Sequence, residues 1–232
     1  MESERKAMLI LAVGIALLFE SVSAQSVSSI ISKYFFNTIL NAADSSCAVK
    51  NFYAYDAFIQ AANAYSGFGT TGTSDDGKRE LAAFFAHVTQ ETASLCYIEE
   101  IDGAKKAFYD ESSTQYPCVA GKTYFGRGPF LLTWNFNYGP AGNDIGFDAL
   151  SYPEKVAQDA TISFKTAVWF RMKQRNCHSA ITSGQGFGAT IQAVSGAIEC
   201  TGRSPDIVNT RIKYYKNYCL KLGVDPGSNL SC

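Results

Sequence analysis

A mainly α-helical domain that is stabilised by disulfide bonds is predicted by three features of the sequence. Apolar residues recur at helical spacing along most of the chain, strand signals are few, and seven cysteines are widely spaced. A chain of 232 residues without internal repeats suits one large domain. The formal net charge of -1 gives no global field that would attract nucleic acid or anionic lipid, so binding depends on local groups.

Residues 1–24 have the pattern of a secretory signal. A positive start at Arg5 and Lys6, a short apolar run and a small-residue cleavage site precede Gln25. The apolar run is too short for a comfortable transmembrane helix, and no later stretch is long enough to span a membrane. We therefore expect a protein secreted to the cell exterior, the cell wall or the vacuole, whose single domain covers residues 25–232.

Six segments carry the helical pattern, and glycine-rich stretches separate them. Residues 66–77 are a loop, and Asp75 and Asp76 can cap the helix that follows. Residues 121–142, rich in glycine and aromatics, are expected to be irregular with room for one short strand. The helical segments are residues 30–40, 55–65, 77–95, 159–174, 186–200 and 205–223.

The cysteines favour disulfide bonds over a zinc site. The chain has no C-x-x-C pair, and its only histidines are His87 and His178. Widely spaced cysteines in an oxidising compartment form disulfides. Because seven is odd, at least one thiol is unpaired or pairs with another molecule.

Glu91 is set apart from the other acidic residues by its helical phase. If residues 80–95 form one helix, Glu91 shares the apolar stripe of Phe84, Val88 and Leu95. An ionised carboxylate is costly in such a place, so burial favours the protonated form that a general acid needs. The alternative is a glutamate at a helix end that turns to solvent or pairs with a lysine.

A second group of acids, Glu99, Glu100 and Asp102, follows the predicted helix in a turn closed by Gly103. One acid in a solvated turn can serve as a general base, and we interpret Glu99 and Asp102 as wet surface residues. A dry acid opposite a wet base is what glycoside hydrolysis requires. Aromatic and amide residues further on either form a sugar-binding wall or belong to the core: Tyr116, Tyr124, Trp134, Asn135, Asn137 and Tyr138.

Eight blocks of the sequence, in one order, resemble the plant-type chitinases of glycoside hydrolase family 19, most closely the class IV catalytic domain. The resemblance covers nearly all of the chain after Gln25, which leads straight into the catalytic domain without a hevein-like chitin-binding module. The blocks are CAVKNFYAYDAF, FGTTGTSDDGKRELAAFFAHVTQET, CYIEEIDGAKK, TQYPCVAGKTYFGRGP, WNFNYGPAG, FKTAVWF, GQGFGATIQAVSGAIEC and RIKYYKNYCLKLGVDPG.

The resemblance implies a lysozyme-like, two-lobed helical domain with a central cleft, which hydrolyses β-1,4-linked N-acetylglucosamine polymers with inversion. It assigns Glu91 as general acid and Glu100 as general base, with the hydroxyl of Thr133 helping to hold the attacking water. Inversion needs carboxyls roughly 6.5–9.5 Å apart. It implies chitin or its oligomers as partner, a monomer, and no cofactor or metal. The further residues that it assigns to substrate binding are Asn137, Tyr138, Tyr116, Tyr124, Lys165 and Arg211.

The chain departs from the family pattern at three cleft positions and at Ala93. Gln90 stands in place of a histidine, Leu131 of a glutamine, Ser195 of an asparagine and Ala93 of a glycine. Losing one substrate hydrogen bond costs about 0.5–1.5 kcal/mol, so three lower efficiency by about one to three orders of magnitude.

Disulfide pairing is likewise implied by the resemblance. It pairs Cys47 with Cys96 and Cys200 with Cys232. It leaves Cys118 without its usual partner, because Tyr109 stands there, and it makes Cys219 a free thiol. Cys177 is extra.

Two functions remain open at this point. The retention of both glutamates favours an active secreted endochitinase. The three altered cleft positions favour a chitinase-like protein that binds chitin oligomers or wall glycans with little or no turnover.

Overall fold

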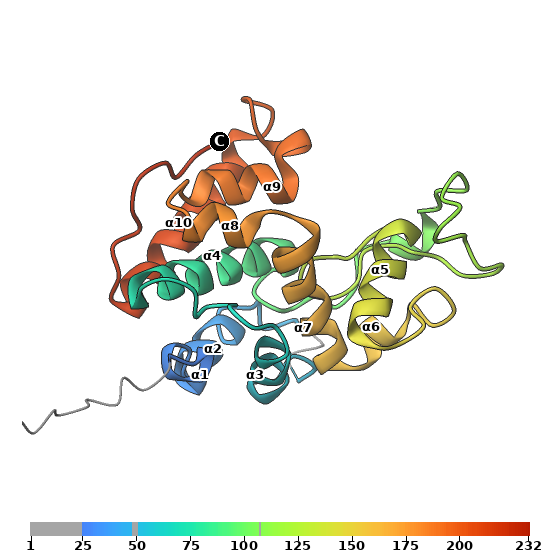
Figure 1. Cartoon of the computed structure of the whole chain (residues 1–232), viewed down its shortest axis with the longest axis horizontal. Coiled ribbons are helices and arrows are strands. Elements are labelled where there is room, and N and C mark those ends of the chain that lie inside the picture. Colours follow the sequence, from blue (N-terminus) through green and yellow to red (C-terminus); the bar gives the residue numbers. More distant parts are fainter. Residues whose placement is uncertain (1–24, 48–50, 107) are drawn as a thin grey trace, which may run out of the picture.

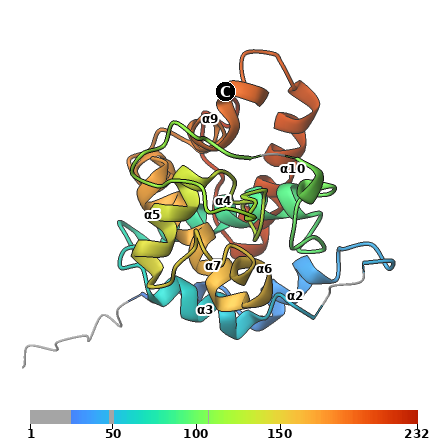
Figure 2. The same ribbon diagram turned by 90° about the vertical axis from the view of Figure 1, so that its right-hand side faces the viewer.

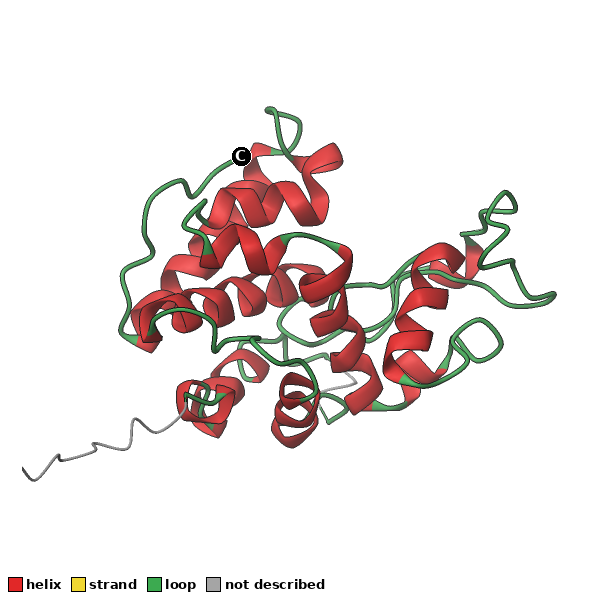
Figure 3. Ribbon diagram, viewed as in Figure 1, coloured by secondary structure: helices red, strands yellow, loops and turns green. Residues whose placement is uncertain are grey.

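The computed structural model describes residues 25–47, 51–106 and 108–232, so the signal-like segment lies outside the described residues. Helices joined by loops make up this part of the chain, and it contains no strand (Figure 3). Its β pairing is limited to isolated bridges from Arg127 to Glu99 and to Leu132. The mainly α-helical prediction is confirmed. None of the described helices is long and apolar enough to cross a membrane.

The helices follow one another along the whole described chain, and six of them correspond to the predicted segments. Four α-helices were not predicted: the short α1 and α6, α5 in the stretch expected to be irregular, and α8 between two predicted helices. The elements are α1 (Val27–Ile30), α2 (Lys33–Leu40), α3 (Tyr55–Asn63), α4 (Ser74–Thr92), η1 (Gly103–Lys105), α5 (Asn135–Ile145), α6 (Lys155–Gln158), α7 (Ala160–Trp169), η2 (Phe170–Gln174), α8 (Cys177–Thr182), α9 (Phe187–Glu199) and α10 (Pro205–Leu222).

Helix α5 forms in spite of its sequence because of close packing. It contains Pro140 and two buried glycines, residues of low helix propensity. A Cβ on Gly139 would lie 2.1 Å from Cδ1 of Tyr116, and one on Gly142 would lie 2.6 Å from Cβ of Ala149. The glycines let these neighbours lie directly on the helix, so tertiary contact overrides local preference.

The helices form two lobes. In Figure 1 the larger lobe holds α1 to α4 and α8 to α10, with α4 and α10 packed along each other, and α7 runs toward the smaller lobe of α5 and α6. The long segment between α4 and α5 reaches into the smaller lobe. In Figure 2 this segment, coloured green, passes in front of α4. The C-terminal end of α4 therefore lies where the two lobes meet.

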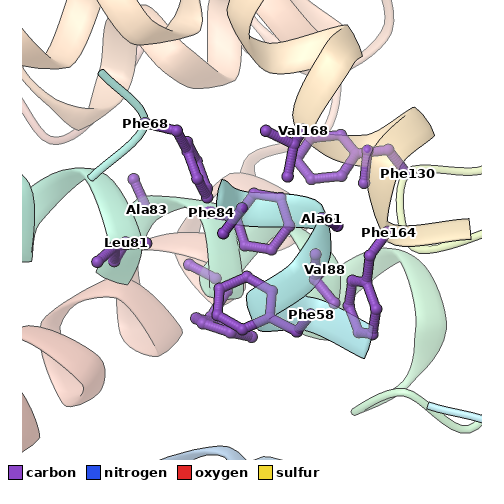
Figure 4. Packing of buried hydrophobic residues seen from close by; sticks show 14 of the residues in the cluster. Phe58, Ala61, Phe68, Leu81, Ala83, Phe84, Val88, Phe130, Phe164 and Val168 are labelled. Carbon is purple, nitrogen blue, oxygen red and sulfur yellow. The ribbon is translucent and has the colours of Figure 1, made fainter. Parts of the chain in front are cut away.

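The core is a cluster of phenylalanine rings from helices far apart in sequence (Figure 4). Phe58 of α3 lies with its centroid 5.8 Å from that of Phe84 of α4 and 5.6 Å from that of Phe164 of α7. All three rings are inaccessible to solvent. Burial of each phenylalanine side chain contributes about 1.5–3 kcal/mol to the free energy of folding. The cluster fixes α4 against α3 and α7 along its length.

Helix α4 begins at a capping box. Thr73 is the N-cap, and its hydroxyl accepts a hydrogen bond from the Asp76 amide at 3.2 Å. The Asp76 carboxylate accepts in return from the Thr73 amide at 2.9 Å, and hydrogen bonds with Thr73 lower the pKa of Asp76. Asp76 thus contributes to the cap as expected, although the N-cap itself is Thr73.

Helix α4 ends earlier than predicted because the backbone turns left-handed for three residues. Ala93, Ser94 and Leu95 have φ angles of 49°, 65° and 64°. The Thr92 hydroxyl accepts from the Leu95 amide at 2.8 Å and donates to the Val88 carbonyl at 2.6 Å. This turn ends the helix one residue after Glu91, which therefore lies in the last turn of α4.

Both disulfides implied by the resemblance, Cys47–Cys96 and Cys200–Cys232, are present. Cys118, Cys177 and Cys219 are free, and burial raises the pKa of the Cys219 thiol to about 11.

In the segment from Asp110 to Cys118, the side chain of Asn135 supplies the cross-connection that a disulfide at Cys118 would have made. Its amide donates to the carbonyls of Asp110 and Tyr116 at 2.9 and 2.7 Å, and its oxygen accepts from the Asp110 amide at 2.8 Å. Asn135 is therefore a structural residue and not part of a sugar-binding wall.

Replacing Ala93 by glycine should stabilise the protein. The left-handed conformation costs a residue with a Cβ about 1–2 kcal/mol of folding free energy, and glycine avoids this cost. Part of the benefit is lost because glycine makes the unfolded chain more flexible. We expect Ala93→Gly to raise the free energy of unfolding by about 1 kcal/mol in urea titrations. Ala197→Gly, at an exposed position inside α9, is the control and should lower it by about the same amount. Destabilisation by Ala93→Gly would contradict this interpretation.

Candidate active site

Two adjoining pockets form a groove, here called the cleft, where the lobes meet. Their volumes are about 430 and 340 Å³, and both are lined by Glu91, Glu100 and Leu131. The larger pocket adds Thr133 and Asn137. Residues that the sequence predicted as acid and base, from two separate segments, thus line a single cleft.

Glu91 is positioned by the last turn of α4 and by a buried arginine. Its side chain is 22% exposed and its carboxylate accepts a hydrogen bond from Nη2 of Arg211 on α10. The prediction of a dry carboxyl on an apolar stripe is wrong in this respect. Glu91 reaches the edge of the core, where it meets a guanidinium instead of hydrocarbon and keeps one side open to the cleft.

Arg211 is held by two carboxylates. Its side chain is 2% exposed, and Glu199 at the end of α9 accepts from Nε at 2.8 Å and from Nη2 at 2.6 Å. Burial alone would lower the pKa of Arg211, but Glu199 and Glu91 outweigh it and raise that pKa. The pair with Glu199 is bidentate, which fixes the guanidinium plane. Arg211 therefore lies behind Glu91 as a fixed positive charge, whereas the resemblance placed it among the residues that bind substrate.

Glu100 is positioned from the opposite side by a short antiparallel contact. Its amide donates to the Gly126 carbonyl at 2.8 Å, and the Gly126 amide points at its carboxylate at 3.3 Å. Gly126 has to lack a side chain because a Cβ there would lie 2.9 Å from Cβ of Leu131. Lys106 donates to the other carboxylate oxygen of Glu100, which is 23% exposed.

The acidic neighbours of Glu100 form ion pairs with other residues. Glu99 accepts from Nε of Arg127 at 3.0 Å, and Asp102 forms an ion pair with Lys105 at 2.7 Å. Both acids are exposed, as predicted for wet surface residues.

Thr133 and Asn137 line the same cleft and contact each other. The Asn137 amide donates to the Thr133 carbonyl at 2.8 Å, while its oxygen accepts from Gln174 at 2.9 Å. The Thr133 hydroxyl donates to the Leu131 carbonyl at 2.6 Å, so its lone pairs remain able to accept from a water.

Four residues assigned to substrate binding by the resemblance lie elsewhere. Tyr124 and Tyr138 are inaccessible to solvent, and their hydroxyls donate to the carbonyls of Leu150 and Phe125. They belong to the core, the alternative that the sequence left open for aromatics. Tyr116 lies over α5 in a different pocket, and Lys165 lines another with Asp144 and Lys173.

The three altered positions all border the cleft. Gln90 and Leu131 line the smaller pocket, and Ser195 lines the larger one. Ser195 interrupts α9 with φ -141°, and among the described residues its buried hydroxyl has no hydrogen-bond partner. The side of the cleft around Glu91 is therefore poorer in polar groups than the family pattern.

Comparison with known proteins identifies the family. Residues 30–232 match the glycoside hydrolase family 19 model, described as Chitinase class I. The chain belongs to glycoside hydrolase family 19. It is 55% identical over 207 residues to Chitinase 6 of Oryza sativa subsp. japonica, covering 89% of this chain and 76% of the rice protein. It is 56% identical to Endochitinase EP3 of Arabidopsis thaliana, covering 89% of this chain and 74% of that protein.

Solved structures of the family share the fold. The class IV chitinase from Zea mays superposes with a TM-score of 0.82 at 53% identity, covering 88% of this chain and 98% of the maize chain. A bacterial family 19 chitinase gives a TM-score of 0.80 at 39% identity, covering 88% and 100%. The lysozyme-like, two-lobed fold expected from the sequence is confirmed, and the chain is a glycoside hydrolase of the chitinase class.

Two residues of this family 19 site were missed by the sequence analysis. Glu199 ends a helix that was predicted correctly, but its partner Arg211 is twelve residues away on another helix, so no local spacing reveals the pair. Lys106, six residues after Glu100, follows a second lysine, Lys105. Only the conformation of η1 decides that Lys106 is the one that contacts Glu100. The described residues contain no group of three or more His, Cys, Asp or Glu arranged to hold a metal ion.

Removing Arg211 should be strongly destabilising, because it leaves Glu199 buried without a counterion. We expect Arg211→Met to lower the free energy of unfolding by about 3 kcal/mol, and Arg211→Met with Glu199→Met to recover a large part of that loss. Urea unfolding measures both. Lys213→Met, at an exposed position of the same helix, is the control. A loss at Arg211 no greater than at Lys213 would contradict the role given to the buried pair.

Proposed function

We propose that this chain is a secreted endochitinase that hydrolyses β-1,4-N-acetylglucosamine linkages of chitin with inversion at the anomeric carbon. The observation that carries the proposal is that Glu91 and Glu100, from separate segments, line one cleft. Family membership and 55% identity to a rice chitinase support the same reaction. The proposal concerns one catalytic domain, residues 25–232, acting as a monomer on chitin or its oligomers.

Glu91 acts as general acid in this proposal. It donates its proton to the glycosidic oxygen as the bond to the anomeric carbon breaks. Glu91 and Glu199 are two carboxylates on one guanidinium, so a proton on Glu91 leaves the group without net charge. When Glu91 loses that proton, Arg211 is already in place to stabilise the new carboxylate.

Glu100 acts as general base. It takes a proton from water while that water attacks the anomeric carbon from the face opposite the leaving group. The Thr133 hydroxyl helps to hold the water. The ammonium group of Lys106 donates a hydrogen bond to the carboxylate oxygen of Glu100 that does not face Gly126. No covalent intermediate forms, because water attacks directly.

Substrate contacts come from a different set of aromatics than the tyrosines first assigned. Trp134 and Phe108 line the larger pocket and Tyr97 lines the smaller one. Trp134 packs edge-to-face on Phe108, with centroids 5.3 Å apart, which fixes its indole. Such faces accept the apolar side of a pyranose, while Asn137 supplies hydrogen bonds.

The second candidate function, binding of chitin oligomers or wall glycans with little turnover, rests on Leu131 and Ser195. An apolar side chain and a buried hydroxyl replace polar groups beside Glu91, which weakens the contacts that orient a sugar for reaction.

Loss of either glutamate should strongly reduce turnover. Glu91→Gln and Glu100→Gln should each lower kcat on soluble chitin hexamer by about 10²–10⁴-fold, the usual effect of removing a general acid or base. Glu99→Gln removes a neighbouring carboxylate that pairs with Arg127, and should retain most of the activity. If the unaltered protein cleaves hexamer no faster than Glu91→Gln while still binding it, the binding function is the correct one.

Restoring polar groups in the cleft should raise the rate. Leu131→Gln and Ser195→Asn should each increase kcat/KM on the hexamer by about 3–10-fold, since each regains one substrate hydrogen bond. Ile101→Gln, a similar change at an exposed residue of the same pocket, is the control and should have little effect. Equal gains at all three positions would show that polarity in general is responsible, and not these contacts.

A further inference from the structure

His87 lies one helical turn before Glu91 on α4 and makes two polar contacts that the reaction described so far does not use. The ring is inaccessible to solvent. Its Nδ1 lies 3.2 Å from Nη1 of Arg211, and its Nε2 lies 2.9 Å from the hydroxyl of Thr190 on α9. The imidazole thus connects α9 to the guanidinium that contacts the general acid.

The donor and acceptor roles in this group have one consistent assignment. A guanidinium only donates, so Nδ1 of His87 has to accept from Arg211. The proton of the neutral ring then lies on Nε2 and is donated to Thr190. The Thr190 hydroxyl has one proton, which it donates to the Phe187 carbonyl at 2.7 Å, so it is free to accept. The Phe187 carbonyl, the Thr190 hydroxyl, both ring nitrogens of His87 and Nη1 of Arg211 each have a partner in this arrangement.

The charges around His87 favour its neutral form. Burial, then Arg211, then Arg171, lower the pKa of His87 well below its ordinary value. The lone pair on Nδ1 is therefore available to Arg211. A protonated ring would instead place two cations in contact away from solvent.

The contact with His87 completes the set of partners that fixes Arg211. Nε and Nη2 bind Glu199, Nη2 also binds Glu91, and Nη1 binds His87. Without an acceptor at Nδ1, a buried N–H of the guanidinium would lack a partner. The guanidinium would then be held by Glu199 alone among its neutral and charged partners behind Glu91, and its contact with Glu91 would be less well fixed.

We propose that His87 and Thr190 are positioning residues for the general acid: Thr190 accepts from Nε2 of His87 and holds the ring, and Nδ1 of His87 holds the guanidinium of Arg211 against Glu91. This inference rests on the proposed function, since it assigns the network to the acid of that reaction. Neither residue touches substrate.

Packing alone gives a competing account of the buried ring. His87 lies between the rings of Phe187 and Phe130, with centroids 5.1 and 6.0 Å away. Aromatic packing requires a flat side chain of this size, but it is indifferent to which ring nitrogen carries the proton. The two accounts therefore differ in what they expect from substitutions that keep one polar contact and remove the other.

A matched pair of substitutions separates the two contacts. In His87→Asn the amide oxygen takes the place of Nδ1 and can accept from Arg211. In His87→Gln the amide reaches the place of Nε2 and can donate to Thr190, but Nη1 of Arg211 loses its acceptor. We expect His87→Gln to lower kcat on chitin hexamer by about tenfold, with KM little changed. His87→Asn should retain most of the kcat of the unaltered protein. Equal losses in both variants, or a loss confined to KM, would overturn the proposal.

The tautomer can be measured without any activity assay. The chain has only two histidines, so imidazole ¹⁵N spectra of labelled protein are readily assigned with a His178→Gln variant. We expect neutral His87 with its proton on Nε2 at pH 7, and the same tautomer in Thr190→Val and Thr190→Ser, because Arg211 leaves Nδ1 only the role of acceptor. Loss of the acceptor for Nε2–H in Thr190→Val should shift the Nε2 resonance, and Thr190→Ser should leave it in place. A proton on Nδ1 in the unaltered protein would overturn the proposal even if the enzyme is active. Complete absence of chitin cleavage would instead count against the proposed function and leave the tautomer result standing.

Discussion

The site depends on one buried interaction, the bidentate pair between Arg211 of α10 and Glu199 of α9. A guanidinium with 2% of its surface exposed is tolerated only because carboxylates satisfy it, and the second of these is Glu91. The pair joins the last turn of α9 to the second turn of α10, and Arg211 also contacts the last turn of α4, so three helices together set the direction of Glu91, the proposed general acid. Without it, a glutamate at the end of a helix would turn to solvent.

The rest of the fold brings a second carboxylate to the same cleft. The left-handed turn at Ala93, Ser94 and Leu95 stops α4 after Thr92, one residue beyond Glu91, and the disulfide at Cys96 fixes the chain beyond it. The following segment then pairs with the backbone at Gly126, which places Glu100 on the other side of the cleft. Glu91 therefore lies against a charged network in the larger lobe, while Glu100 lies on a solvated turn, and this difference in surroundings suits the roles proposed for them.

The sequence predicted the helices with long apolar stripes and the two catalytic candidates, because both depend on local spacing and on a very specific resemblance. It failed where a tertiary contact decides. Helix α5 was missed because its glycines have low helix propensity. They allow close packing with Tyr116 and Ala149, which the sequence pattern does not reveal. Tyr124 and Tyr138 were expected on the cleft because the residue type alone does not show whether an aromatic side chain is buried. The charge beside Glu91 was missed because Arg211 lies on another helix and 120 residues away.

The central claim is that Glu91 and Glu100 act from opposite sides of the scissile bond, with water attacking directly. The anomeric form of the first product tests it most directly. We expect ¹H NMR spectra, recorded within minutes of adding enzyme to soluble chitin hexamer, to show the α-anomer at the new reducing end before mutarotation mixes the two forms. Initial formation of the β-anomer would mean that the configuration is retained, and would contradict the roles given to both glutamates.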